Sequence, residues 1–376
     1  MIKLNRRKFL EFGGSTFAGG LLAQNSFAGI NTAKEKAQSV TPMIHATDLY
    51  HVHCDPDDHW DLASIYSLAY SGLIDLKGIL IDFPGRPQLG DPDVMGVAQM
   101  NYYTGLVVPS VVGTPYLMKN RNDTAPDANR IEQQGIIWLL DTLKRSSDPV
   151  VVNIVGTATN VAIALKKEPA LFREKCKAIY LNAGSGYLGK DNKVEYNVSL
   201  NPSAYAAIFD SSCPVFWLPC VHTAGIGEVG EYGTYYKFLQ KDILPDLPKK
   251  LQKFFLFMLG LKQSSMWLSY LNSQTEEELL IKHVNLYRNM WCTAGFLHAA
   301  GKKVTTDGEI VNENSGKKSV FSFRPIDVKC DDQGFTSWKI DAQIKDRYIF
   351  HVDDIVKYQV AMTIALKSLL LQLPQD

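Results

Sequence analysis

Residues 43–61, MIHATDLYHVHCDPDDHWD, are rich in side chains that bind metals and move protons. Five aspartates and four histidines lie in this stretch: Asp48, Asp55, Asp57, Asp58 and Asp61, with His45, His51, His53 and His59. Carboxylates bind hard cations such as Ca²⁺ and Mg²⁺, whereas imidazoles are common ligands of Zn²⁺ and other transition metals. The first question is therefore which metal this stretch would bind, and for which reaction.

The elements expected around the stretch separate its aspartates from its histidines. MIHATD is typical of a buried strand that ends at Asp48, and the residues from about Asp58 to Tyr70 are typical of a helix that opens at Asp57 and Asp58. Carboxylates at a strand end and at the next helix start converge, and their repulsion of about a few kcal/mol is relieved by a bound cation. An oxygen-rich site of this kind favours Ca²⁺, with Asp48, Asp55, Asp57 and Asp58 as candidate ligands.

Two simpler interpretations compete with the calcium site. An aspartate at a helix start is often only an N-cap, so Asp55 or Asp57 alone would carry little weight. His51 and His53 fall in an expected loop without the helical spacing of many zinc sites, and most such histidines are structural or solvated. We therefore rank a histidine site well below an oxygen site.

The rest of the chain predicts the fold that holds this site. Apolar runs such as LKGILID, VVPSVVG, PVVVNIVG, AIYLNAG and PVFWLPC alternate with helices expected at about 93–104, 129–145, 158–166 and 202–211. This alternation predicts an α/β fold with an open, mostly parallel sheet covered by helices on both faces, and a ligand beyond the carboxyl ends of the strands. A helical cap at about 230–300, further strands and a last helix at 353–372 complete the prediction.

The N-terminus reads as a targeting segment. Arg6 and Arg7 precede a weakly apolar stretch and the small residue Ala28, a pattern typical of a twin-arginine export signal over residues 1–28. The apolar stretch is too short and too glycine-rich to span a bilayer, so we expect no stable membrane insertion. Residues 29–41 read as a linker and 42–376 as the domain, with a periplasmic or secreted location expected.

Composition narrows the substrate. The chain has 39 Lys plus Arg and 39 Asp plus Glu, so its net charge does not attract nucleic acid or an anionic membrane. A small, roughly neutral substrate is therefore favoured. Six cysteines lack CxxC pairs, so they suggest neither a zinc site nor a disulfide scaffold, although Cys213 and Cys220 are a candidate pair.

Four segments, in order over about residues 43–225, resemble the inosine/uridine-preferring nucleoside hydrolase family. The acidic stretch resembles its DTDxGxDD signature, and GTATN resembles its GPLTN segment through Gly156, Thr159 and Asn160. AIYLNAGSG resembles its strand that ends in a glycine pair, and VEYN resembles its ribose-binding segment through Glu195 and Asn197. A second register would place Asp55 and Asp61 on the signature; we prefer the one that ends the strand at Asp48.

The resemblance implies an enzyme that cleaves the N-glycosidic bond of a ribonucleoside. It implies Ca²⁺ bound by Asp48, Asp58 and the backbone carbonyl of Val155, with Asp48 as general base and Asp57 orienting the water or the ribose. The implied substrate-binding residues are Asn160, Glu195 and Asn197, and Trp291 is a candidate to stack on a ring. Members of the family are often dimers or tetramers, so the resemblance allows a homo-oligomer.

The sequence also departs from the family. DFPGRPQ lacks the expected asparagine, and RNMWCTAGFLHAAG has Trp291 near the place of a calcium-binding aspartate, so either Asp55 or Asp61 compensates or metal affinity and activity are altered. His222 and His298 are candidates for the acid that protonates the leaving group. A hydrolase of another glycoside and a non-catalytic, metal-dependent carbohydrate-binding protein therefore stay open as alternatives.

Overall fold

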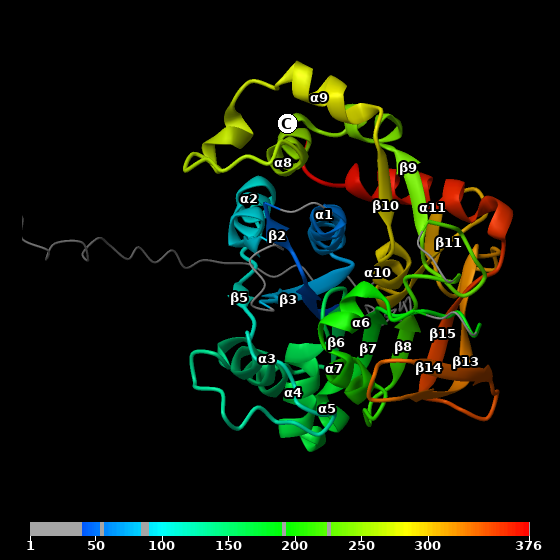
Figure 1. The fold of residues 1–376 in the computed structure, drawn as a ribbon. Coiled ribbons are helices and arrows are strands. Elements are labelled where there is room, and N and C mark those ends of the chain that lie inside the picture. Colours follow the sequence, from blue (N-terminus) through cyan, green and yellow to red (C-terminus); the bar gives the residue numbers. More distant parts are fainter. Residues whose placement is uncertain (1–39, 53–55, 84–89, 190–192, 224–226, 376) are drawn as a thin grey trace, which may run out of the picture. The chain divides into compact units, whose positions relative to one another are not determined.

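The computed structural model describes residues 40–52, 56–83, 90–189, 193–223 and 227–375 (Figure 1). The predicted signal segment, nearly all of the linker and the predicted ligand Asp55 lie outside the described residues. The described chain from Val40 onward is one structural unit. In this part of the chain no helix is both long and apolar enough to cross a membrane.

A nine-stranded sheet forms the centre of the fold, in the order β14-β13-β15-β8-β7-β6-β1-β3-β5. Its strands are β1 (Thr41–Thr47), β3 (Ile74–Ile81), β5 (Ser110–Val112), β6 (Val150–Ile154), β7 (Cys176–Asn182), β8 (Val215–Leu218), β13 (Phe321–Cys330), β14 (Thr336–Ile340) and β15 (Arg347–Val352). The strands from β5 to β15 pair in parallel, whereas β13 pairs antiparallel with both β15 and β14. The predicted open, mostly parallel sheet is confirmed.

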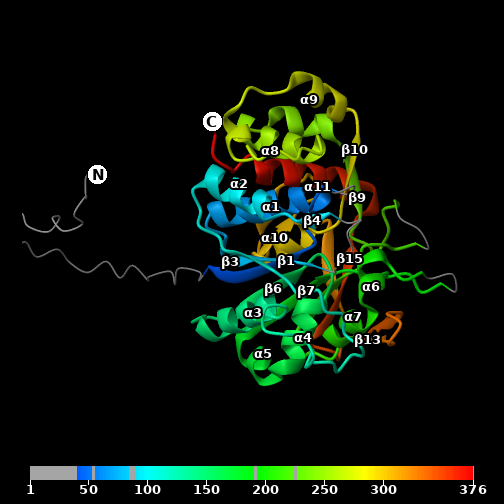
Figure 2. The same cartoon turned by 60° about the vertical axis from the view of Figure 1, so that its left-hand side comes forward.

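Helices cover both faces of this sheet, as predicted. The helices are α1 (Asp57–Tyr70), α2 (Val94–Thr104), α3 (Gln134–Arg145), α4 (Thr159–Lys167), α5 (Pro169–Lys175), α6 (Tyr196–Leu200), α7 (Pro202–Ile208), α8 (Lys249–Leu259), α9 (Glu277–Val284), α10 (Thr293–Ala299) and α11 (Ile355–Leu370). Figures 1 and 2 show α1, α2, α10 and α11 on one face and α3, α4, α5 and α7 on the other.

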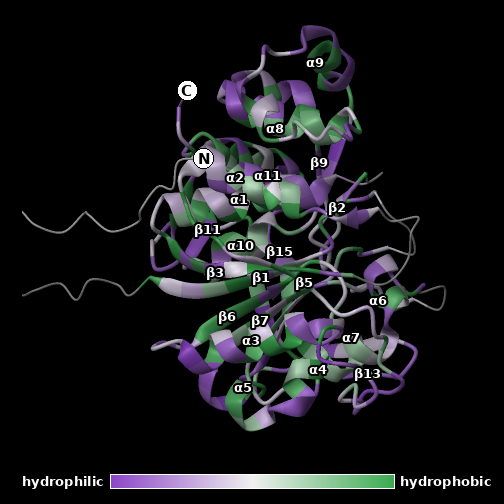
Figure 3. Ribbon diagram, turned by 90° about the vertical axis from the view of Figure 1, so that its left-hand side faces the viewer, coloured by the Kyte–Doolittle hydropathy of each residue, from purple (hydrophilic) through white to green (hydrophobic). Residues whose placement is uncertain are grey.

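The strands separate two apolar cores. Along β1, Met43 packs into the core beneath α1 and α11, and its neighbours Ile44 and Ala46 pack into the opposite core beneath α3 and α4. This alternation follows from the two-residue period of a strand. Figure 3 shows the inner strands as hydrophobic and the outer helix α9 as largely hydrophilic.

The predicted cap contains strands as well as helices. Between the sheet strands β8 and β13, β9 (Tyr236–Leu239) and β10 (Tyr287–Met290) form an antiparallel ribbon, and α8 and α9 lie beyond α2 and α11, farthest from the sheet (Figure 1). Two smaller ribbons pair β2 (Tyr50–His51) with β4 (Asp91–Pro92) and β11 (Lys302–Val304) with β12 (Ile310–Asn312).

Two details differ from the sequence prediction. Helix α3 begins at Gln134 rather than near 129, because the side chain of Asn129 accepts hydrogen bonds from the backbone N–H groups of Ile131 and Glu132 and holds a turn. The predicted Cys213–Cys220 pair is wrong. Both thiols are free, and they lie beyond opposite ends of β8, an extended segment too long for the Cα separation of about 6 Å that a disulfide needs.

Candidate functional site

The strand order reverses at the carboxyl end of β1. From β1 the chain builds β3 and β5 on one side, then returns to build β6, β7 and β8 on the other. Open α/β sheets bind ligands at such a reversal, beyond the carboxyl ends of the strands. Asp48 follows β1 here, Asp82 follows β3, and Val155 and Gly156 follow β6.

Three acids meet at this reversal of strand order. Asp48, Asp58 and Asp82 are 8%, 6% and 1% exposed. The Thr47 hydroxyl donates to Asp58 Oδ1 at 2.7 Å, which ties the start of α1 to the end of β1. The two oxygens of Asp82 accept from the Thr157 N–H at 2.6 Å and from Asn160 Nδ2 at 2.9 Å. Strand β1 ends at Thr47, one residue before the predicted end at Asp48, and helix α1 begins at Asp57 as predicted.

Electrostatics confirm that the three carboxyl groups are close to one another. Burial, then the charges of Asp58 and Asp82 and a hydrogen bond with Asp58, raise the pKa of Asp48 well above its usual range. Burial raises the pKa of Asp82 to about 7, although hydrogen bonds from Thr157 and Asn160 oppose the shift. A bound cation would let all three acids ionise together.

Gly156 allows the close approach of two of these acids. A methyl group at Gly156 would lie 2.5 Å from Asp82 Oδ2 and 2.9 Å from Asp48 Cβ, closer than packed atoms come. Only a residue without a side chain therefore fits where β6 ends between the two aspartates. The carbonyl of Val155, the residue before it, accepts from Asn197 Nδ2 at 3.0 Å.

This donor set fits a hard cation. It consists of buried carboxylate oxygens and a backbone carbonyl, and such oxygen ligands suit Ca²⁺ or Mg²⁺. Asp48 and Asp58 were predicted from the sequence as metal ligands. Asp82 was missed, although its position at the end of the buried run LKGILID is the signal that could have found it.

Comparisons with known proteins agree with this geometry. The family model described as inosine-uridine preferring nucleoside hydrolase matches residues 52–255, more than half of the chain. The chain belongs to this family. It is 25% identical over 178 residues to the pyrimidine-specific ribonucleoside hydrolase RihB of Escherichia coli O157:H7. This match covers 43% of this chain and 56% of that protein.

Two further relatives extend the comparison. The chain is 31% identical over 74 residues to the pyrimidine-specific ribonucleoside hydrolase RihA of Citrobacter koseri, across 20% of this chain and 24% of that protein. The matched stretches thus span about a quarter to a half of these curated relatives. The plant nucleoside hydrolase PpNRh1 has the same fold, with a TM-score of 0.53 at 13% identity over 87% of this chain and 99% of that one.

The segment that resembles the family's ribose-binding motif lies at the start of α6. Glu195 caps this helix, and its carboxylate accepts from the Asn197 N–H at 2.9 Å and the Gly184 N–H at 3.0 Å. Asn197 donates to the Val155 carbonyl, and its buried Oδ1 has no hydrogen-bond partner among the described residues. Glu195 therefore positions the start of α6, and contact of Glu195 or Asn197 with a ribose stays a prediction.

Asn160 lies beside the acids, and both ends of its side-chain amide make hydrogen bonds within the protein. Its Nδ2 donates to Asp82, and its Oδ1 accepts from the Thr114 N–H at 2.8 Å, which ties the end of β5 to the end of β3. The residue is 1% exposed. These contacts make Asn160 a residue that orients Asp82, and its contact with a substrate stays a prediction.

Asp57 and Asp61 face the segment in which the family's late aspartate is missing. Burial raises the pKa of the Cys292 thiol, and the charges of Asp61 and Asp57 and a hydrogen bond with Asp61 raise it further. Cys292 follows Trp291, the residue near the place of the missing acid. Of the two aspartates expected to compensate, Asp61 reaches this segment, and Asp55 lies outside the described residues.

The aromatic and histidine candidates differ in their surroundings. The Trp291 ring lies 5.6 Å from that of Tyr235, and its indole N–H has no partner among the described residues. His222 Nδ1 accepts from the Tyr232 N–H at 3.2 Å, and burial lowers the pKa of His222. His298 packs behind the sheet, where its Nδ1 is 2.7 Å from the Tyr180 hydroxyl and burial lowers its pKa to about 4. His298 is therefore a core residue.

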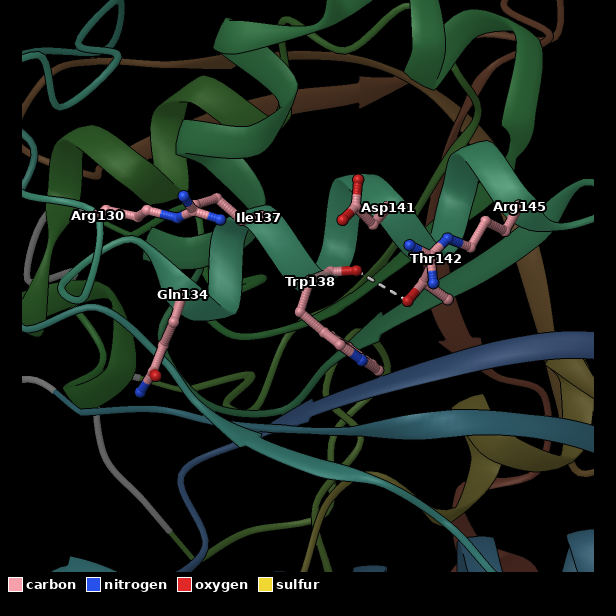
Figure 4. Close-up of a pocket in the computed structure, with 7 residues that line it drawn as sticks. All are labelled: Arg130, Gln134, Ile137, Trp138, Asp141, Thr142 and Arg145. Atoms are coloured by element: carbon pink, nitrogen blue, oxygen red, sulfur yellow. Dashed lines mark hydrogen bonds between the residues drawn. The ribbon is translucent and has the colours of Figure 1, made fainter.

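A hollow along α3 is separate from this site. Figure 4 shows its lining residues: Arg130, Gln134, Ile137, Trp138, Asp141, Thr142 and Arg145. The Thr142 hydroxyl donates to the Trp138 carbonyl at 2.8 Å, a bond within the helix. None of these residues belongs to the acidic cluster, so the hollow has no part in its chemistry.

Proposed function

We propose that this member of the family is a metal-dependent hydrolase that cleaves the N-glycosidic bond of a ribonucleoside. The observation that carries the proposal is the buried group of Asp48, Asp58 and Asp82 at the reversal of strand order. Neighbouring carboxyl groups repel one another when they ionise, and a bound cation relieves that repulsion. The relatives named for pyrimidine-specific ribonucleoside hydrolysis support the substrate class.

The cation of the proposal is Ca²⁺. Asp48, Asp58 and the Val155 carbonyl would hold it, with Asp57, Asp61 and Asp82 supplying further negative charge nearby. When bound, Ca²⁺ acidifies a water molecule and aligns the ribose hydroxyls. All of these donors are oxygens, as a hard cation requires.

Side chains near the cation would carry out the separate steps of the hydrolysis. Asp48 accepts a proton from the attacking water as general base, and Asp57 orients the water or the ribose. Asn197 Oδ1 accepts a hydrogen bond from a ribose hydroxyl. The surrounding carboxylates stabilise the positive charge that develops on the sugar as the bond to the base breaks.

His222 is the proposed proton donor to the leaving base. Because the Tyr232 N–H donates to His222 Nδ1, the neutral ring carries its own proton on Nε2. The lowered pKa favours this neutral form at pH 7, whose Nε2–H would hydrogen-bond to the base, and proton transfer would come from the minor imidazolium form, which returns to neutral imidazole. Trp291 would stack on the base or the sugar.

The test is ribose release from a panel of purine and pyrimidine nucleosides. We expect turnover that EGTA removes, that Ca²⁺ restores, and that Asp48→Asn lowers by about 10³-fold. Asn122→Ala, at an exposed position, serves as the control variant. A purified, Ca²⁺-loaded protein that releases ribose from no nucleoside would overturn the proposal, and turnover of another glycoside would redirect it to that substrate class.

Export is part of the proposal and rests on residues 1–28. We expect that replacing Arg6 and Arg7 with lysine retains the chain in the cytoplasm of a host with a twin-arginine pathway. Fractionation of cells that express both forms measures this. Equal amounts of the two forms outside the cytoplasm would contradict the proposed signal.

A further inference from the structure

A second polar cluster lies beneath α8, apart from the three acids. It consists of His51 on β2, His59 on α1 and Asp93 at the N-cap of α2. The ribbon of β2 with β4 brings His51 to Asp93, and the Asp93 N–H donates to the Leu49 carbonyl at 3.0 Å. Three elements that are separate in sequence thus deliver these side chains to one place.

The geometry of the cluster is that of a set of metal ligands. One donor atom from each of the three side chains lies within 4.8 Å of the others. His59 Nε2 is 2.8 Å from Asp93 Oδ2, and His51 Nδ1 is 3.7 Å from the same oxygen. The side chains are only 2–3% exposed. Donors around a tetrahedral Zn²⁺ ion, at about 2.0–2.2 Å from the metal, are about 3.3 Å apart.

The hydrogen bonding of His51 leaves one of its ring nitrogens able to bind a metal ion. His51 Nε2 contacts the Lys262 carbonyl, which can only accept, so Nε2 carries a proton. A neutral His51 therefore presents the lone pair of Nδ1 to the Asp93 carboxylate. The Asp93 carboxylate lies 2.8 Å from His59 Nε2 and accepts from the Gly96 N–H at 2.9 Å. A metal ion between His51 Nδ1 and this carboxylate would bind both groups.

We propose that His51, His59 and Asp93 bind a divalent first-row transition metal ion of the Zn²⁺ type. Two imidazoles and a carboxylate suit such an ion, whereas the oxygen-only acidic cluster suits Ca²⁺. The Lys262 carbonyl fixes the tautomer of His51 that leaves Nδ1 free to bind metal, as a residue in the second layer of a zinc site does. The Gly96 N–H, which donates to Asp93 Oδ1 at 2.9 Å, orients the carboxylate.

The position of the site predicts what the metal does. The His51 ring stacks on Phe257 of α8 with 5.3 Å between ring centroids, and the His59 ring is 5.9 Å from Phe254. Lys262 follows α8 in the chain. Figures 1 and 2 show α8 above α1 and α2, so a metal here joins the cap to the helix whose first turn carries Asp57 and Asp58. Its role is structural.

Titration with Co²⁺, a visible probe for zinc sites, tests the proposal. The full chain is stripped with a chelator, the acidic cluster is saturated with Ca²⁺, and Co²⁺ is added. We expect one equivalent to bind, with the intense visible absorption of a four-coordinate site, and Zn²⁺ to displace it. Failure of wild-type protein to bind Co²⁺ or Zn²⁺ stoichiometrically would overturn the proposal and identify the cluster as a hydrogen-bonded ion pair.

Two conservative variants locate the binding. His59→Gln keeps an N–H that can donate to Asp93, and Asp93→Asn keeps the cap of α2 through its Oδ1. Each should weaken Co²⁺ binding at least about 100-fold and remove the rise in Tm that Zn²⁺ gives the wild type. His298→Gln, a buried substitution on α10, is the matched control and should bind as the wild type does. Equal binding by wild type and His59→Gln would overturn the proposal.

Discussion

Asp58 and His59 are neighbours in α1, yet they contribute to two different polar clusters. Consecutive side chains of a helix point about 100° apart, so Asp58 meets the Thr47 hydroxyl at the end of β1 and His59 meets Asp93 beneath α8. The acidic cluster is built from carboxylates around a reversal of strand order, whereas the histidine cluster is built from imidazoles closed by the cap. One short acidic stretch therefore supplies side chains to two clusters, for which we propose different metal preferences.

The pair of neighbours allows the sharpest test of this division. We expect Asp58→Asn to lower kcat/KM for nucleosides at least about 100-fold, because it removes a charged ligand while keeping an acceptor for Thr47. His59→Gln should leave kcat/KM at saturating Ca²⁺ within about 3-fold of wild type, since it acts at a separate site. Steady-state ribose release measures both. Circular dichroism checks that both variants are folded. If both then lose activity to the same extent, the two clusters act as one site.

The second prediction concerns proton donation to the leaving base by His222. His222→Gln should lower kcat for inosine or uridine by about 10²-fold, because the leaving base departs without a proton. A riboside with a p-nitrophenol leaving group needs no such proton, so its kcat should barely change. Comparison of the two substrates measures the role. A parallel fall for both would show that His222 supports the loop around Tyr232 and Gly230 rather than the reaction.

A smaller effect is expected at the sugar side. Asn197→Ala removes both the buried acceptor Oδ1 and the donor to the Val155 carbonyl, so KM should rise about 10-fold, the value of one hydrogen bond of about 1.4 kcal/mol. Substrate titration of the variant beside Asn122→Ala gives the comparison. An unchanged KM with a lowered kcat would mean that Asn197 acts through the Val155 carbonyl alone.

The fold and two of the three members of the acidic cluster can be predicted from the sequence, for identifiable physical reasons. Continuous apolar strands and the charged start of α1 are local signals, and they place Asp48 within one residue of the end of β1 and Asp58 in the first turn of α1. Asp82 was overlooked because the loop that follows it has no family motif, and only pairing of β3 beside β1 brings it to Asp48.

The histidine cluster could not be predicted from the sequence for a similar reason. His51 and His59 have no spacing that suggests a shared ligand, and Asp93 is 34 residues from His59. The short ribbon of β2 with β4 and the covering helix α8 create the site. Helix α8 lies within the predicted helical cap, but the two-residue strands of the ribbon have no local pattern. Long-range packing, rather than residue type, decides which polar side chains meet.

The last prediction uses pH to separate the two clusters. In metal-free protein Asp48 and Asp82 have pKa values above those of the unfolded chain, with Asp82 near 7 against an ordinary 3.8. The folded state therefore binds more protons. The stability that Asp82 contributes is full below about pH 4 and is lost as pH rises through about 7, and the contribution of Asp48 falls in the same direction. The loss is on the order of a few kcal/mol.

Ca²⁺ should offset this loss, because it lets the acids ionise without mutual repulsion. The rise in Tm on adding Ca²⁺ should therefore be larger at pH 8 than at pH 5, by about several °C. Thermal unfolding in His59→Gln, whose histidine cluster cannot bind metal, assigns the effect to the acids. A Ca²⁺ effect of equal size at both pH values would mean that Ca²⁺ binds elsewhere than at the acids.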